Sequence, residues 1–454
     1  MQSVLRESEM IKRIVNIVLS VALACVSASA TAYGESRDGR YETRTFVPDV
    51  ATLRVQYVPS EQVPISYLSR PYLVLNGDAG LDVSFDQLSH EVHYYTYTLR
   101  HLDYDWTADE LTSQEYLAGP LTMEITDQEI SFNTQQDYTH YRFTFPNEDM
   151  RPTVSGNYVL IIYEDNDPEK VVATACFSVV EPGATIHARV RGNTDIEYSG
   201  RYQQLDVEVD LGNPYSTMDN RFAALVVTQN NRTDNAVVNP KPTFVEPQRL
   251  RWQNNRALIF EGGNEYRHFD ISSEYFMGQG VDHISFDHSV AKEALRCSGY
   301  HAFLFEDEPR TGGYLYNQDA DGRFVINREK RDDNDVEADY MWVHWILPAD
   351  QWLDGSVYVV GDLFENKLSA QSRMEYDAKH RAYVFTAYLK QGGYEWLYLF
   401  YNTRTSASGS AERVEGSYWQ TRNSYRLMYY YRGLSDRYTR LLCVENVENA
   451  LISN

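Results

Sequence analysis

The sequence predicts an all-β protein built from tandem β-sandwich domains of the immunoglobulin-like type. Short stretches in which apolar and polar residues alternate recur along the chain, and clusters of Gly, Pro, Asn, Asp and Ser separate them. Many short strands between turn signals are typical of β-sandwiches. The composition agrees, because 36 tyrosines stand beside 18 phenylalanines. A tyrosine ring can be buried on a strand while its hydroxyl group reaches water.

The N-terminus has the features of a signal peptide, which we place at residues 1–32 and exclude from the fold. Lys12 and Arg13 precede an apolar run at 14–24 that is too short to span a bilayer. Small residues follow at 28–32, where they offer two cleavage sites. We therefore expect an exported protein.

Two questions about this segment stay open. Met10 is an alternative start, because residues 1–9 are charged and lack signal character. Cys25 follows Ala-Leu-Ala, which lacks the leucine that a lipidation signal usually carries three positions before the cysteine. Lipidation at Cys25 is therefore the alternative and not the main expectation.

Two breaks divide the remaining chain into three predicted domains. Glu181-Pro182-Gly183 is the clearest linker signal, and Arg328–Asp335 is a run of charged and polar residues without an apolar one. We therefore expect an N-terminal β-sandwich domain at 44–182, a middle β domain at 184–333 and a C-terminal immunoglobulin-like β-sandwich domain at 336–446.

The first domain shows the alternating pattern most clearly. Tyr141, Phe143 and Phe145 share one face of a predicted strand, and Pro146 ends it. The proline-rich stretch 44–71 is expected to form extended edge segments. Further strands are predicted at 72–75, 81–85, 94–99, 138–145, 158–163 and 173–180.

The same pattern continues in the other two domains. Leu205, Val207, Val209 and Leu211 alternate with acidic residues, which indicates a strand with one buried face. The middle domain is further expected to hold strands at 223–227 and 258–260 and a short helix at 289–295. The third domain is expected to hold strands at 341–347, 357–360, 383–389, 394–400 and 425–431.

The net charge of -24 limits the possible partners. An acidic chain repels nucleic acid backbones and anionic membrane surfaces, so we expect no nucleic acid partner. We interpret the acidity as a means of solubility, with a basic partner surface as the alternative. After signal cleavage three cysteines remain, and this odd number at wide spacing does not indicate a disulfide framework. We expect one of them, Cys176, to be a small buried residue.

We find no motif that predicts catalysis. His90 and His93 flank a Glu-Val pair, but a zinc protease helix needs its two histidines four positions apart. No nucleophile elbow, phosphate-binding glycine loop or Cys-His metal spacing occurs. We therefore expect no enzyme and no cofactor.

One turn is a weak candidate for calcium. Asn317, Asp319 and Asp321 stand at positions one, three and five of a possible calcium loop, and Gly322 follows at position six. Position twelve is Arg328, where such loops carry a bidentate glutamate. We predict a polar turn that ends in glycine and leave weak calcium binding as the alternative.

The third domain resembles the immunoglobulin-like glycogen-binding modules found beside amylases. The resemblance rests on the stretches 356–364, 374–376 and 392–398. In those modules a tryptophan that stacks on sugar follows the phenylalanine, whereas here Glu365 and Asn366 stand in that place. We expect a shared fold without the sugar site. A second aromatic platform built from Trp352, Trp396 and Trp419 is the alternative to their packing in the core.

An ordered set of short motifs resembles the plug proteins of the type IX secretion system in Bacteroidetes. One departure is Arg100-His101-Leu102, where a His-Cys-Asn-like triplet is expected. The motifs run from the first domain nearly to the C-terminus: Ser84–Asp86, Leu102–Trp106, Tyr138–Tyr141, Ser155–Tyr158, Gly262–Asp270, Ala338–Tyr340, Leu389–Gly392, Thr421–Tyr425 and Tyr430–Arg432.

The resemblance implies a function without chemistry. A plug protein is a periplasmic, monomeric β protein that binds the periplasmic side of the outer-membrane translocon barrel and seals it when no cargo is present. We expect clustered Tyr and Trp on one exposed surface as the contact, although the sequence does not identify the partner-binding residues. The alternatives are a periplasmic or surface carbohydrate-binding protein and an envelope scaffold lipoprotein anchored at Cys25.

Overall fold

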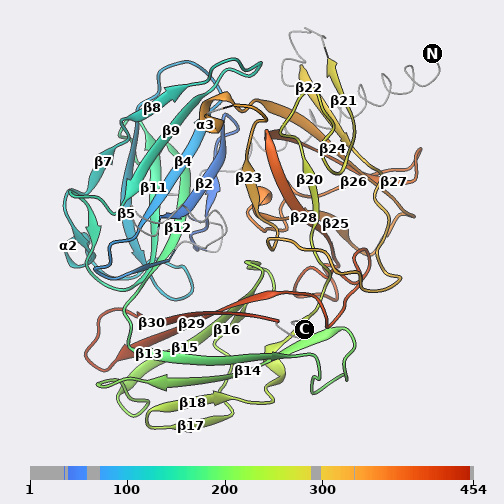
Figure 1. Ribbon diagram of the computed structural model, residues 1–454. Coiled ribbons are helices and arrows are strands. Elements are labelled where there is room, and N and C mark those ends of the chain that lie inside the picture. The colour runs from blue at the N-terminus through green and yellow to red at the C-terminus, as the bar shows by residue number, and fades with distance from the viewer. Residues whose placement is uncertain (1–34, 36–38, 59–71, 288–297, 332, 450–454) are drawn as a thin grey trace.

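The computed structural model describes residue 35 and the ranges 39–58, 72–287, 298–331 and 333–449. The predicted signal peptide, Cys25 and the predicted helix at 289–295 lie outside these ranges. Apart from a few short helices, the regular secondary structure of the described ranges consists of β-strands in mainly antiparallel sheets, which confirms the predicted tandem β-sandwich fold (Figure 1). No described helix is long and apolar enough to cross a membrane.

The first sandwich contains two sheets that enclose one core. One sheet has the order β1-β12-β11-β5-β7, with β3 parallel to β12, and the other has the order β2-β4-β9-β8. Its strands are β1 (Arg44–Thr45), β2 (Val50–Val58), β3 (Tyr72–Val74), β4 (Gly80–Gln87), β5 (Tyr95–Leu102), β7 (Thr122–Glu124), β8 (Asp127–Ile130), β9 (Thr139–Phe145), β11 (Gly156–Glu164) and β12 (Val171–Val180). Helix α2 (Ser113–Tyr116) and the short pair β6 (Leu117–Ala118) and β10 (Arg151–Pro152) close one end.

The second sandwich is assembled from two separate parts of the chain. Strands β29 (Ser424–Gly433) and β30 (Arg440–Glu448) return near the C-terminus and complete the sheet β16-β15-β29-β30. The opposite sheet has the order β13-β14-β18-β17, with β19 beside β14. The remaining elements are β13 (Ala184–Arg191), β14 (Tyr202–Leu211), β15 (Asn220–Gln229), β16 (Val237–Val238), β17 (Phe244–Glu246), β18 (Arg249–Trp252), η3 (Arg256–Leu258) and β19 (Ile259–Glu261).

The third sandwich lies between these two parts in the sequence. Its sheets have the orders β20-β28-β23, with β25 beside β28, and β21-β22-β24-β27-β26. Its elements are β20 (Arg267–Asp270), β21 (Val281–Asp287), β22 (Gly299–Leu304), β23 (Phe324–Ile326), α3 (Asn334–Glu337), β24 (Tyr340–Pro348), β25 (Ser356–Val360), η4 (Asp362–Phe364), β26 (Glu375–Asp377), β27 (Ala382–Lys390) and β28 (Gly392–Tyr401).

The sheets divide the chain differently from the boundaries predicted at 184–333 and 336–446. Strands β20 to β23 belong to sheets of the third sandwich, and β29 and β30 belong to the second. Leu225, for example, pairs with Tyr429 across about half the chain. Alternation reveals a strand and its buried face, but it does not identify the partner strand. The predicted boundary near 328–335 therefore falls between β23 and β24, two strands of the same sandwich.

Most of the individual strand predictions are confirmed. Leu205, Val207, Val209 and Leu211 are buried on one face of β14. Tyr141 and Phe145 are fully buried, and Phe143 packs at the edge of the same core. The strand predicted at 258–260 starts later, because residues 256–258 form a 3-10 turn. Cys176 is half-buried rather than buried, and burial raises the pKa of its thiol to about 12. Of the described cysteines, Cys176 and Cys443 are free.

Candidate functional site at the junctions of the sandwiches

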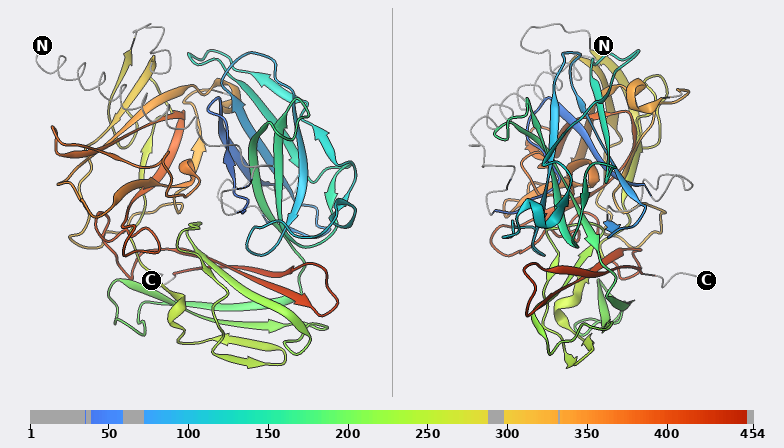
Figure 2. Two further views of the ribbon diagram at one scale, coloured as in Figure 1. Left: turned by 180° about the vertical axis from the view of Figure 1, so that it is seen from behind. Right: turned by 90° about the vertical axis from the view of Figure 1, so that its left-hand side faces the viewer.

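The three sandwiches form a closed triangle in which each touches both others (Figures 1 and 2). The chain passes from the first to the second once, at 181–183. It passes from the second to the third at 262–266 and returns at 402–423. Within the ranges that the structure describes, no chain crossing connects the first sandwich to the third. Their contact, which we call the closing junction, is therefore noncovalent in the described part of the chain.

The closing junction is centred on a buried ion pair. Asp86 on β4 contacts Lys390 on β27 at 2.6 Å, and each side chain is only 1% exposed. His140 Nδ1 and the Tyr340 hydroxyl also contact the Asp86 carboxylate, at 2.6 and 2.7 Å. The Lys390 ammonium group donates to the Asp335 carbonyl at 2.6 Å and lies 4.1 Å from the centre of the Tyr138 ring.

Charge pairing decides the ionisation of Asp86. Burial opposes ionisation of this carboxyl group, but Lys390 and the hydrogen bond from His140 outweigh burial and lower its pKa to about 2. Burial also lowers the pKa of Lys390, against the attraction of Asp86. A buried charge without its partner is costly, so this pair favours the arrangement in which both sandwiches are in contact.

A second group of contacts extends the closing junction towards α3. Arg54 pairs with Asp335 at 2.6 Å. Thr52 lies at a bulge in β2 with a φ of 52°, which is rare for a β-branched residue, and its hydroxyl group contacts the Tyr340 hydroxyl at 2.6 Å. Asp339 accepts the backbone N–H groups of Gln135 and Gln136 at 2.6 and 3.1 Å. The bulge therefore aims a strand residue across the junction.

A third contact is made by the loop in which glycogen-binding modules carry a sugar-stacking tryptophan. Glu365 accepts the backbone N–H of Thr45 at 3.2 Å, and Lys367 donates to the Thr43 carbonyl at 3.2 Å. The loop that carries sugar-stacking residues in glycogen-binding modules thus holds the first sandwich here. The proposed second platform does not form, because Trp396 is buried, Trp352 packs on Tyr383 and Phe400, and Trp419 packs on Gly192.

The junction between the first and second sandwiches contains an apolar cluster and, at its edge, the ion pair between Arg437 and Glu115. Tyr104 packs on Phe222 with ring centres 4.7 Å apart, and the Tyr430 hydroxyl donates to Asn157 at 2.8 Å. The backbone also continues across it, since Glu181 N–H donates to the Leu441 carbonyl at 2.9 Å. The buried residues of the apolar cluster at this junction are Val180, Ala224, Val226, Met428, Tyr430 and Leu441.

The junction between the second and third sandwiches is polar and surrounds the two chain crossings. Asn423 donates to Gln203 at 3.0 Å and to the Gly262 carbonyl at 2.7 Å. Ser410 donates to Glu261 at 2.8 Å. On the third sandwich, the returning crossing is anchored by Glu415.

Glu415 is fully buried and paired with two arginines. Arg267 Nε lies 3.1 Å and Arg310 Nε 2.7 Å from its carboxylate oxygens, and Tyr398 N–H donates at 3.0 Å. Burial opposes the ionisation of Glu415, but the two guanidinium groups outweigh it and lower its pKa. Arg267 also pairs with Asp307 at 2.6 Å, so that one ion network fixes the base of this crossing.

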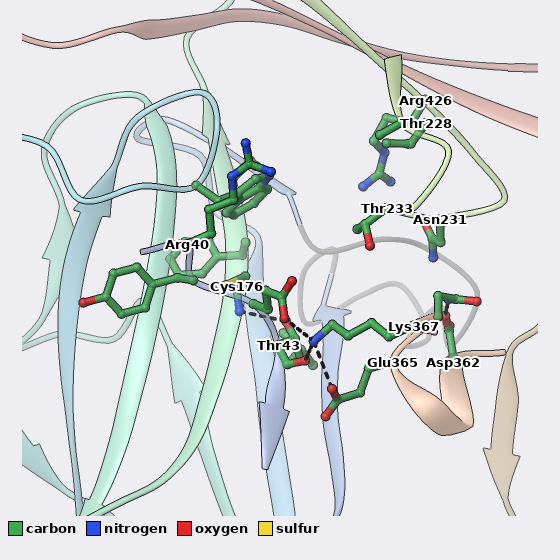
Figure 3. Close-up of a pocket in the computed structure, with 18 of the residues that line it drawn as sticks. Arg40, Thr43, Cys176, Thr228, Asn231, Thr233, Asp362, Glu365, Lys367 and Arg426 are labelled. Atoms are coloured by element: carbon green, nitrogen blue, oxygen red, sulfur yellow. Dashed lines mark hydrogen bonds and ion pairs between the residues drawn. The ribbon is translucent and has the colours of Figure 1, made fainter. Parts of the chain in front are cut away.

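A cavity of about 400 Å³ lies where the three sandwiches meet (Figure 3). The Lys367 ammonium group reaches across one side of it towards the first sandwich, as Figure 3 shows. The cavity is therefore a product of the closed triangle. Labelled lining residues are Arg40, Thr43 and Cys176 from the first sandwich, Thr228, Asn231, Thr233 and Arg426 from the second, and Asp362, Glu365 and Lys367 from the third.

An exposed apolar loop lies beside the closing junction. Tyr275, Phe276 and Met277 are consecutive and are 78%, 61% and 62% exposed. We call them the aromatic loop. The preceding Glu274 is held by Arg328 at 2.8 Å and Gln391 at 3.0 Å, so the base of the loop is fixed. The expectation of exposed tryptophans was wrong, since all seven are buried or half-buried.

Carboxyl groups at the candidate calcium turn accept hydrogen bonds from backbone N–H groups of the protein. Asp319 accepts the backbone N–H of Tyr266, and Glu395 accepts those of Ala320 and Gly322. Burial and the neighbouring carboxylates raise the pKa of Asp319 to about 8. Asn317 contacts His268 at 3.5 Å. In the described ranges no group of three or more His, Cys, Asp or Glu residues is placed to hold a metal ion.

The two histidines of the His-x-x-His stretch are engaged separately. His90 Nε2 lies 2.9 Å from the Ser131 hydroxyl, and His93 Nδ1 lies 2.6 Å from Glu164. Both precede β5 in a segment without helix. The stretch therefore contributes to packing of the first sandwich.

The closing junction gathers residues that the sequence had marked only as parts of motifs. Asp86, His140, Tyr340 and Lys390 come from four different motifs and meet in one network. Sequence reasoning assigned them no role, and it missed Arg54 and Asp335. The sequence offered one signal for this network, namely charged and polar residues within strands. Such residues are rarely buried without a partner, so they indicate paired groups.

In comparisons with known proteins, the first sandwich matches a family model, and 90% of the chain matches a solved structure. A family model described as "Type 9 secretion system plug protein 1st domain" matches residues 50–181. A crystal structure of a hypothetical protein from Parabacteroides merdae is similar, with a TM-score of 0.84 and 36% identity, over 90% of this chain and 100% of that chain. An alkylpurine DNA glycosylase from Pseudomonas fluorescens, bound to DNA, reaches a TM-score of only 0.15 at 8% identity and carries no argument. The search of curated proteins found no match.

Proposed function

Because the chain belongs to the type IX secretion system plug protein family, we propose that it is the plug subunit of that system. In this proposal it resides in the periplasm and binds the periplasmic side of the outer-membrane translocon barrel. It seals the barrel when no cargo is present. The work is steric, and no reaction is catalysed.

The closed triangle is the observation that carries this proposal. Sealing an opening needs a body that keeps its shape, and each sandwich here has its own hydrophobic core. In the closed triangle, contacts at three junctions hold these bodies together. Four ionisable groups at the closing junction, Asp86, Lys390, Arg54 and Asp335, make ion pairs between sandwiches. Because these groups make structural contacts between sandwiches, they support a scaffold rather than a catalyst.

The aromatic loop is the surface we assign to the barrel. Protein interfaces are anchored by a few large apolar or aromatic side chains with a polar rim around them. Tyr275, Phe276 and Met277 supply three such side chains on a fixed base. Lys330 lies 5.3 Å from the ring centre of Phe276 and contributes to the polar rim. Reversible binding requires this mixture, since a wholly apolar contact would not release.

The proposal is tested by measuring binding of the purified mature chain to the purified translocon barrel. Replacing all three residues of the aromatic loop by serine is expected to weaken binding about tenfold or more. The matched control replaces Phe244 and Val245, which are 54% and 59% exposed on β17, by serine and leaves binding unchanged. No binding of the unaltered chain in any cargo state would refute the plug function. An equal effect of both variants would refute the assigned surface.

A second test addresses the seal itself. Cells that keep the barrel but lack this chain are expected to admit small solutes that the outer membrane otherwise excludes. An unchanged permeability barrier would contradict the sealing role.

A further inference from the structure

The two junctions of the first sandwich differ in chemistry. Its contact with the second buries an apolar cluster that includes Val180, Met428 and Leu441. Within the described ranges, no hydrophobic cluster contains residues of both the first and the third sandwich. The closing junction consists of ion pairs and hydrogen bonds, together with the contacts of the buried Tyr138 ring with Tyr340 and with the Lys390 ammonium group.

This difference predicts which junction opens. Separating apolar surfaces exposes them to water without compensation. Separating hydrogen-bonded groups exchanges protein partners for water, so the net loss is small. For a buried ion pair, the hydration that the ions regain offsets much of the lost attraction. The closing junction is therefore the one that can open reversibly.

The chain path supplies a pivot for such opening. The third sandwich is attached to the second by two crossings, at 262–266 and 402–423. Both contain glycines in the left-handed region, Gly263 with a φ of 60° and Gly416 with a φ of 77°. The contacts around the crossings are hydrogen bonds rather than a shared apolar core. Val414 and Glu415 attach the returning crossing to the third sandwich, so a pivot at Gly416 leaves that hydrophobic cluster and that ion network intact.

We propose that the third sandwich is a hinged arm and that the closing junction is its latch. The first and second sandwiches stay together as one unit. The arm pivots at the crossings that contain Gly263 and Gly416, separates Asp86 from Lys390 and opens the central cavity. The inference rests on the chain path and the chemistry of the junctions, and it does not depend on the proposed plug function.

Backbone amides on both junctions allow a direct test by hydrogen exchange with mass spectrometry on the full mature chain. The N–H groups of Phe132, Gln135 and Gln136 donate only across the closing junction. Those of Glu181 and Gly183 donate across the apolar junction. A peptide covering 131–138 is expected to exchange about tenfold or more faster than one covering 179–184.

Weakening the latch should act on one junction only. Lys390→Met leaves the Asp86 carboxylate buried without its counter-ion, so exchange of the 131–138 peptide is expected to rise about tenfold or more. The 179–184 peptide should be unaffected, and the radius of gyration in solution should increase. Tyr340→Phe, which removes one hydroxyl group from the latch, should act in the same direction more weakly. Lys379→Met makes the same change at an exposed position and is the control.

The outcomes separate a latch from a rigid junction. Equal and slow exchange of both peptides, with no response to Lys390→Met or Tyr340→Phe, would overturn the proposal. Faster exchange of both peptides in the same variant would also overturn it, because that pattern reports general unfolding. Selective exchange at 131–138 together with a larger radius of gyration supports it.

Discussion

Removing the charge of Glu415 should destabilise the third sandwich severely. This side chain is 0% exposed and lies within 3.1 Å of both Arg267 and Arg310. Glu415→Gln keeps the shape and one acceptor for Tyr398 N–H, but it leaves two guanidinium groups with one fewer negative charge. Breaking a buried ion pair from one side costs about 3–5 kcal/mol. Arg267 retains Asp307, so we expect about 3 kcal/mol.

A double-mutant cycle tests the physical reason for this loss. Arg310→Met alone should cost about 2 kcal/mol, because Arg267 still neutralises Glu415. The double variant Arg310→Met with Glu415→Gln should cost about 2 kcal/mol less than the sum of the single variants. The assay is urea unfolding of the mature chain, read at the transition that Glu415→Gln shifts. A loss below about 1 kcal/mol for Glu415→Gln, or strict additivity, would refute the argument.

Three further predictions concern other buried groups. Asp86 has a folded-state pKa of about 2, below its ordinary value, so the stability that its charged form contributes is complete above about pH 4 and is lost as the pH falls through 2. Solution scattering between pH 5 and 2 should therefore show the closing junction weakening. A scattering profile that stays constant over this range would contradict this. Asp319 has a pKa raised to about 8, so its protonated form is stabilised and stability falls as the pH rises from about 4 through 8. Asp319→Asn should therefore flatten the dependence of melting temperature on pH between about 4 and 8. If calcium instead raises the melting temperature and Asp319→Asn abolishes that rise, the calcium loop is supported. Met428→Ala, in the apolar junction, should cost about 2–5 kcal/mol in urea unfolding, and a loss near zero would show that this cluster does not hold the first two sandwiches together.

The predicted strands agree with the structure where one face is buried along their whole length. Strand β14 is an example, because its alternation of Leu and Val with acidic residues fixes which side faces the core. Prediction was poorer for the division into domains, since the pairing of β15 with β29 joins residues about two hundred positions apart. Local alternation carries no information on such a partner.

The candidate site was visible only as fragments. The motifs that contain Asp86, His140, Tyr340 and Lys390 were each noted for resemblance to plug proteins, yet nothing in their spacing places them together. The sequence predicted an exposed cluster of Tyr and Trp, but all seven tryptophans are buried or half-buried, and the exposed cluster consists of Tyr275, Phe276 and Met277. Exposure depends on the neighbours of a residue in space, which a single sequence does not give.

By itself, then, the sequence determined the β class, the position of most strands and the buried face of each, because these follow from side-chain periodicity along one segment. It also carried the ordered motifs by which the family was recognised. Only the tertiary structure decided that the third sandwich is inserted into the second, that noncovalent contacts between described residues close the triangle, and that Asp86 meets Lys390 there. Those features depend on contacts between distant segments, and their energies arise only when burial brings the charges together.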